Sequence, residues 1–163
     1  MILLFFIDEI SDEALEKVIS FQKDTGLPVY SFGYNYKKYA RIGDYTHIDG
    51  SPFDFLKVMN QCKVVMTDSF HATVFSMIFH SEFYTFTRKY THNQNQSTRI
   101  ESLLKRVEDI DRFNPVVFSH PPKYEKYDEY FELQRKITDE YLVDILGEKS
   151  LYTFRQDDEI EFD

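Results

Sequence analysis

The segment Lys63–Thr87, KVVMTDSFHATVFSMIFHSEFYTFT, decides the fold class. It opens with a short apolar run (63–68), continues with a longer run that is apolar nearly all round (69–81), and closes with a second short run (82–87). Short apolar runs bounded by turn residues predict buried strands, and a longer run that is apolar all round predicts a buried helix. The segment therefore predicts a strand–helix–strand unit whose strands lie parallel in one sheet.

The same alternation extends in both directions along the chain. Further strands are expected at 2–7, 27–33 and 45–49, and further helices at 11–26, 51–62, 97–107 and 123–147. The helix at 51–62 has the clearest start, because Ser51 suits the N-cap, Pro52 the first turn and Asp54 the third helical position. The pattern predicts an α/β fold: a Rossmann-like open parallel sheet with helices on both faces.

The chain is expected to contain one main domain. Residues 1–112 form the α/β domain, residues 113–147 form a Pro-containing connection and a long C-terminal helix, and residues 148–163 form an acidic tail. The length of 163 residues suits this reading, because a single domain of that size buries a substantial core.

Composition excludes several classes of partner. The net charge of −9 argues against nucleic acid or an anionic membrane, and no apolar run approaches the length of a membrane span. The apolar start, MILLFFIDEI, lacks the basic region and cleavage site of a secretory signal and is interpreted as a buried strand. The single cysteine, Cys62, excludes an internal disulfide and fits a reducing compartment, so we expect a cytoplasmic protein.

Motifs for common cofactors are missing from the sequence. The five histidines have no helical metal-ligand spacing, and neither a dinucleotide fingerprint, a P-loop nor a GxSxG elbow occurs. We predict no metal site and no bound cofactor.

Ligands of open α/β sheets bind beyond the carboxyl ends of the strands. The residues expected there are Asp8, Gly33, Asp49 with Ser51, Asp68 with Ser69 and His71, and Arg88 with Lys89. The last two clusters follow successive strands and could be neighbours in space, although the sequence leaves the strand order open.

His71 is the leading catalytic candidate. It falls in the first turn of a helix that Asp68 or Ser69 would cap, where unpaired backbone amides favour a phosphate or carboxylate. A bound anion would favour the protonated imidazole, so His71 could donate a proton only while an anionic substrate is present. The alternative is a buried histidine hydrogen-bonded to a backbone carbonyl.

Three cations are candidates for holding such an anion. Arg88 and Lys89 follow a strand on the ligand side, where an arginine can grip a carboxylate or phosphate with two bonds. Arg99 opens the next helix, where a cation opposes the helix dipole and therefore does not serve helix stability. The alternatives are a solvated edge for the first two, and pairing of Arg99 with Glu101 or Asp109.

The segments SPFDFLKVMNQCKVVMTDSFHATVFSMIF, EFYTFTRK and NQSTRIESLLKRV together resemble the C-terminal half of the polysaccharide pyruvyl transferase family. The resemblance is good over about residues 50–112, loose over 1–49 and absent over the last fifty residues. It implies one lobe of an architecture similar to GT-B glycosyltransferases. It also implies transfer of the enolpyruvyl group of phosphoenolpyruvate to a sugar of a bacterial surface polysaccharide, which forms a pyruvate ketal without an obligatory metal.

In that picture the motif histidine matches His71 and acts as general acid. Arg88, Lys89 and Arg99 would hold the carboxylate and phosphate, and Asp68 with Ser69 would complete the substrate-binding set. Family members are longer, so the resemblance implies a missing N-terminal lobe that carries the acceptor-binding residues. We expect the chain alone to bind phosphoenolpyruvate weakly or to dimerise over the exposed cleft face, and whether it is an enzyme by itself stays open.

Two other functions compete with this one. A GT-B-type glycosyltransferase would bind a nucleotide-sugar at the same sheet edge, and a non-catalytic binding or assembly domain would keep the fold without the reaction. Binding of phosphoenolpyruvate, compared with UDP- and GDP-sugars, separates these possibilities.

Overall fold

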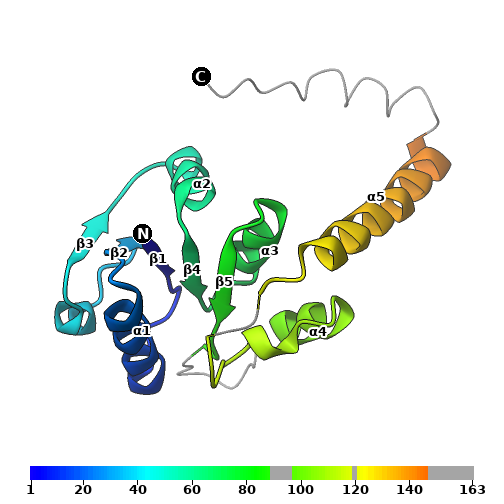
Figure 1. Cartoon of the computed structure of the whole chain (residues 1–163). Coiled ribbons are helices and arrows are strands. Elements are labelled where there is room, and N and C mark those ends of the chain that lie inside the picture. The colour runs from blue at the N-terminus through cyan, green and yellow to red at the C-terminus, as the bar shows by residue number, and fades with distance from the viewer. Residues whose placement is uncertain (89–96, 119–120, 147–163) are drawn as a thin grey trace. The chain divides into compact units, whose positions relative to one another are not determined.

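The computed structural model describes residues 1–88, 97–118 and 121–146 (Figure 1). The chain divides into two compact units, Met1–Tyr124 and Glu125–Asp163, and each is described by itself.

A five-stranded parallel sheet forms the centre of the first unit. Its strands are β1 (Ile2–Phe5), β2 (Val29–Phe32), β3 (Tyr45–Ile48), β4 (Val64–Thr67) and β5 (Glu82–Thr85). The predicted Rossmann-like open sheet is therefore confirmed, and the apolar start of the chain forms a buried strand within it.

The strands lie in the order β3-β2-β1-β4-β5. The chain builds outward from β1 in one direction and then returns to place β4 on the other side of β1. The order of the sheet thus reverses between β1 and β4, and such a switch point opens a crevice beyond the carboxyl ends of the two strands. Sequence patterns left this order open, and it determines where the site lies.

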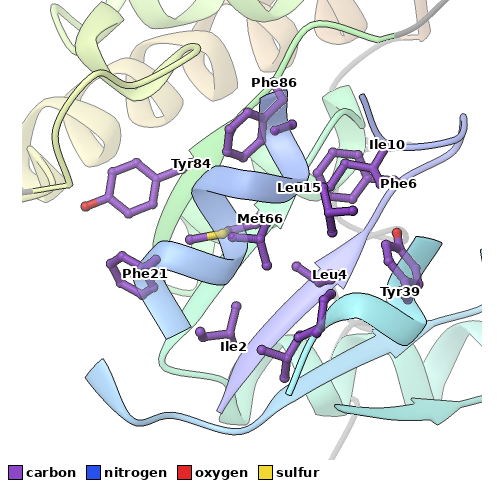
Figure 2. Packing of buried hydrophobic residues seen from close by; sticks show 14 of the residues in the cluster. Ile2, Leu4, Phe6, Ile10, Leu15, Phe21, Tyr39, Met66, Tyr84 and Phe86 are labelled. Atoms are coloured by element: carbon purple, nitrogen blue, oxygen red, sulfur yellow. The ribbon is translucent and has the colours of Figure 1, made fainter. Parts of the chain in front are cut away.

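Helices cover both faces of the sheet, as predicted. On one face, Leu4 and Met66 face each other across neighbouring strands and pack with Leu15 and Phe21 of α1 (Asp12–Thr25) in one buried cluster (Figure 2). Side chains alternate along a strand, so Phe5 points to the other face, where its ring lies 4.5 Å from that of Phe55. Phe55 belongs to α2 (Pro52–Gln61), which packs beside α3 (Phe70–Ile78).

Caps define the helix ends. The Ser11 hydroxyl accepts a hydrogen bond from the Ala14 amide at the start of α1 (3.1 Å). At α2, the Asp54 amide donates to the Ser51 hydroxyl (3.3 Å) and the Ser51 amide donates back to the Asp54 carboxylate (2.8 Å). This reciprocal capping box satisfies two otherwise unpaired amides and confirms the predicted helix start.

The outer edge of β5 is closed by residues that follow α4 (Ser97–Arg106). The Arg112 guanidinium donates to the carbonyl of Phe83 (2.8 Å), and the Asn114 amide donates to the carbonyl of Thr85 (2.8 Å). Arg112 is 1% exposed and forms an ion pair with Asp109 at 2.9 Å. Arg112, held by its ion pair with Asp109, therefore covers the outer edge of β5 together with Asn114. The sequence patterns did not predict how this edge is covered.

The described part of the second unit belongs to α5 (Tyr124–Leu146), the long helix predicted at 123–147. Its surface carries polar pairs such as Lys136 with Glu132 at 3.1 Å. Within residues 1–88, 97–118 and 121–146, no helix is both long enough and apolar enough to cross a membrane.

Candidate functional site

Asp68 lies at the switch point, directly after β4. Its carboxylate accepts hydrogen bonds from the backbone amides of Ile7 (2.7 Å) and Asp8 (3.2 Å), which follow β1. Asp68 is only 3% exposed. Asp68 therefore ties together the carboxyl ends of β1 and β4 at the switch point.

Arg88 joins Asp68 from the carboxyl end of β5. Its Nε lies 3.4 Å from Asp68 Oδ2, and its Nη2 donates to the Asp68 carbonyl at 3.3 Å. The Arg88 side chain is 11% exposed, so it is not the solvated edge that was the alternative interpretation. The expected proximity of the two strand-end clusters is confirmed.

Two influences oppose each other at the Asp68 carboxyl group. Burial raises its pKa, while the amides of Ile7 and Asp8 and the Arg88 guanidinium act in the opposite direction. All of these partners belong to the protein itself. Asp68 therefore positions Arg88 and the loop after β1, and its carboxylate is buried among these groups.

Ser69 caps α3, and it is one of the two residues, with Asp68, that the sequence offered for the cap. Its hydroxyl accepts from the Ala72 amide (3.4 Å) and its carbonyl accepts from the Thr73 hydroxyl (2.8 Å). Ser69 is 1% exposed. Its hydrogen bonds shape the first turn of α3, which fixes the direction in which that turn presents the next residues.

His71 is the second residue of α3 and is exposed to solvent. The alternative of a buried histidine held by a carbonyl is therefore wrong. Its ring meets Phe70 edge-to-face, with 5.9 Å between the centroids. The amides of Phe70 and His71 precede the first hydrogen bond of the helix, from Thr73 to Ser69, so this end of α3 presents both an imidazole and backbone donors.

Phe70 also brings Arg99 to the same place. The Arg99 guanidinium lies over the Phe70 ring at 5.2 Å, which is a cation–π contact. Arg99 is exposed at the start of α4, as expected, but its contact is with Phe70, and Asp109 pairs with Arg112. Sequence reasoning missed Phe70, although it stands beside His71 in the motif. Lys89 lies outside the described residues.

Arg88 also borders a cavity of about 330 Å³ on the α1 side of the sheet. Ser11, Ala14 and Lys17 of the α1 region line it, together with Thr87 and Asn114 near the end of β5. Through Asp68, Arg88 links this cavity to the first turn of α3. In the described parts of the chain, no group of three or more His, Cys, Asp or Glu side chains is arranged to hold a metal ion.

Comparison with known families supports the resemblance seen in the sequence. The family model for polysaccharide pyruvyl transferase matches residues 2–90, which is more than half of the chain. The chain belongs to the polysaccharide pyruvyl transferase family. The match begins at β1 and so includes the N-terminal part where the resemblance is loose, whereas Arg99 and the rest of α4 lie beyond it.

The family assignment agrees with the position of the site. Asp68, Ser69, His71 and Arg88 all fall inside the matched residues. No curated protein and no solved structure matches the chain. A pyruvyl transferase of polysaccharides acts on a saccharide acceptor, so a saccharide is the substrate that the family implies.

Proposed function

We propose that this chain is the donor-side domain of a pyruvyl transferase that moves the enolpyruvyl group of phosphoenolpyruvate onto a sugar of a surface polysaccharide. One observation supports this most directly. The exposed imidazole of His71 and the guanidinium of Arg99 both contact the ring of Phe70, at the amide end of α3. That arrangement offers a proton and positive charge to one anionic substrate.

The proposed roles follow from this geometry. The phosphate or carboxylate of phosphoenolpyruvate binds at the amide end of α3 and against Arg99, while Arg88, held in place by Asp68, faces the other anionic group. Lys89 remains a candidate for the same task. Ser69 acts indirectly, because it shapes the turn that carries His71.

In the proposed reaction His71 donates a proton to the methylene carbon of phosphoenolpyruvate, which becomes a methyl group. One hydroxyl of the sugar adds to the adjacent carbon, and its proton returns to His71. A second hydroxyl then displaces phosphate and gives its proton to the leaving group. The products are a cyclic pyruvate ketal and inorganic phosphate, and the cations stabilise the charge that builds on the phosphate.

The site belongs, in this proposal, to one lobe of a GT-B-like enzyme with two lobes. The location of the site supports it, because the switch point between β1 and β4 is where the crevice of a Rossmann-like lobe opens.

Calorimetry tests the donor directly. Phosphoenolpyruvate should bind the chain, and UDP- and GDP-sugars should not. Replacing Arg99 with Gln should weaken binding at least about tenfold, because a hydrogen bond to a charged group contributes about 1.5–3 kcal/mol. Arg41→Gln is the matched control, since Arg41 is a half-exposed arginine that pairs with Glu16 and Asp12 of α1.

The proton-transfer role of His71 needs its own measurement. On addition of phosphoenolpyruvate, the NMR resonances of the His71 imidazole should move to those of the protonated ring, and His71→Gln should still bind phosphoenolpyruvate. Unmoved resonances would reject the role of His71. Binding of nucleotide-sugars alone would favour glycosyl transfer, and a folded chain that binds neither ligand would favour a non-catalytic domain.

A further inference from the structure

Two tyrosines form an aromatic surface at the carboxyl end of β2. The chain leaves β2 through Gly33, whose φ of 79° is a left-handed conformation that glycine adopts readily. The rings of Tyr34 and Tyr36 then stack with 5.9 Å between centroids and 11° between planes. We call this pair of rings the tyrosine platform. Tyr34 is 49% exposed, so its ring is the one that faces solvent.

The platform is held rigidly. The Tyr36 hydroxyl donates to the carbonyl of Ile7 at 2.8 Å, which fixes it to the loop after β1. The Tyr36 ring also meets Tyr39 edge-to-face at 5.6 Å, and Tyr39 is 1% exposed. Burial, together with Asp68 and Asp8, raises the pKa of Tyr36 to about 12, so the hydroxyl keeps its proton and remains a donor.

The platform lies at the same sheet edge as the proposed donor site. Ile7, which accepts from Tyr36, is also the residue whose amide donates to Asp68. The carboxyl edge of the sheet therefore presents a row in the order of its strands: the tyrosines after β2, the loop after β1, Asp68 after β4 and Arg88 after β5. The platform and the proposed donor site are two parts of one edge.

Charged groups lie along that row. The cations Arg88 and Arg99 come from the β5 side, whereas the carboxylates of Asp8 and Asp68 act on the hydroxyl of Tyr36. A neutral sugar ring suits the platform, because the apolar C–H face of the ring can stack on tyrosine while its hydroxyls donate to a nearby carboxylate such as Asp8.

We propose that the tyrosine platform is a subsite for the acceptor saccharide, with one sugar ring stacked on Tyr34. This inference rests on the proposed function, because it needs a saccharide acceptor beside the donor. It assigns to this chain an acceptor contact that the family resemblance assigns to a second lobe. Tyr34 is a specificity-determining residue in this arrangement, and Tyr36 positions it.

Saturation-transfer NMR on the full chain tests the proposal, with methyl β-galactoside, methyl β-glucoside and methyl α-mannoside as probes. At least one glycoside should receive saturation through the protons of one face of its ring. Tyr34→Ala should weaken the binding of that glycoside about tenfold, as expected for loss of an aromatic stacking contact. Tyr34→Phe keeps the aromatic ring and should bind the glycoside as the native chain does. Tyr141→Ala is the matched control, because Tyr141 is 63% exposed on α5.

The outcomes separate the two proposals. Phosphoenolpyruvate binding, measured in parallel, should be unchanged in Tyr34→Ala. If glycosides bind through Tyr34 and phosphoenolpyruvate does not bind, the saccharide subsite stands and the proposed donor fails. If no glycoside binds, if Tyr34→Ala binds as well as the native chain, or if adenosine or uridine occupies the platform instead, the saccharide subsite is overturned.

Discussion

Replacing Arg112 with Met should destabilise the first unit strongly, although the side chain lies outside the proposed site. Arg112 is 1% exposed, and its partner Asp109 is 3% exposed. Methionine keeps most of the volume of the arginine stem but leaves the Asp109 carboxylate buried without its ion pair and the Phe83 carbonyl without its donor. Loss of one partner of a buried ion pair costs about 3–5 kcal/mol, and we expect a value in that range.

Urea unfolding followed by far-UV circular dichroism measures this cost by linear extrapolation. Arg41→Met is the matched control, because Arg41 makes its ion pairs at the surface, where its side chain is 50% exposed. Exposed pairs contribute about 0–1 kcal/mol, so the control should lose no more than that. Asp109→Asn combined with Arg112→Met should recover part of the stability, because no unpaired charge then remains buried.

The comparison between the two arginines is decisive. Equal losses of unfolding free energy in Arg112→Met and Arg41→Met would refute the argument, since burial is the property that distinguishes them. A double variant no more stable than Arg112→Met would show that the Phe83 carbonyl, and not the charge of Asp109, carries the cost.

Three further predictions concern single side chains. Tyr36→Phe should reduce the loss of stability at alkaline pH: the pKa of Tyr36 is about 12 in the folded chain and about 10 when unfolded, so stability falls as pH rises between these values, and urea midpoints across that window should decline less steeply in the variant. Cys62 is 7% exposed and burial raises its thiol pKa to about 12, so Ellman's reagent should react with it only after unfolding in guanidinium chloride; rapid reaction of the native chain would contradict this. Phe70→Leu removes the cation–π contact of Arg99, which is worth about 0.5–1 kcal/mol at an exposed site. Calorimetry should therefore show severalfold weaker binding of phosphoenolpyruvate. An unchanged affinity would mean that the contact between Phe70 and Arg99 does not contribute to the proposed donor site.

Local chemistry along the chain was sufficient to predict most of the elements. The capping box at Ser51 and the alternation of short apolar runs with longer ones are properties of neighbouring residues, so they can be read without knowing the rest of the fold. The parallel sheet followed from that alternation. The strand-end rule then placed His71, Asp68 and Arg88 at one edge, and the structure brings Asp68 and Arg88 into an ion pair there.

The roles of individual polar residues were harder to predict. The sequence predicts Asp68 and Ser69 as substrate ligands, and the structure adds that their side chains accept hydrogen bonds from the amides of Ile7, Asp8 and Ala72. Arg112 gave no signal, because its partners Asp109 and Phe83 matter only once β5 is at the edge of the sheet. Phe70 could have been noticed beside His71, yet its contact with Arg99 requires α3 and α4 to pack together.

The sequence by itself determined the class of fold and the family, because hydrophobic periodicity, caps and the ordered motifs are encoded locally. Only the tertiary structure decided that β4 lies beside β1, and with it the position of the switch point, since strand order depends on contacts between residues far apart in the chain. The same long-range pairing puts the tyrosines after β2 and Arg88 after β5 on one edge of the sheet. Neither group can be assigned to a common site from the sequence alone.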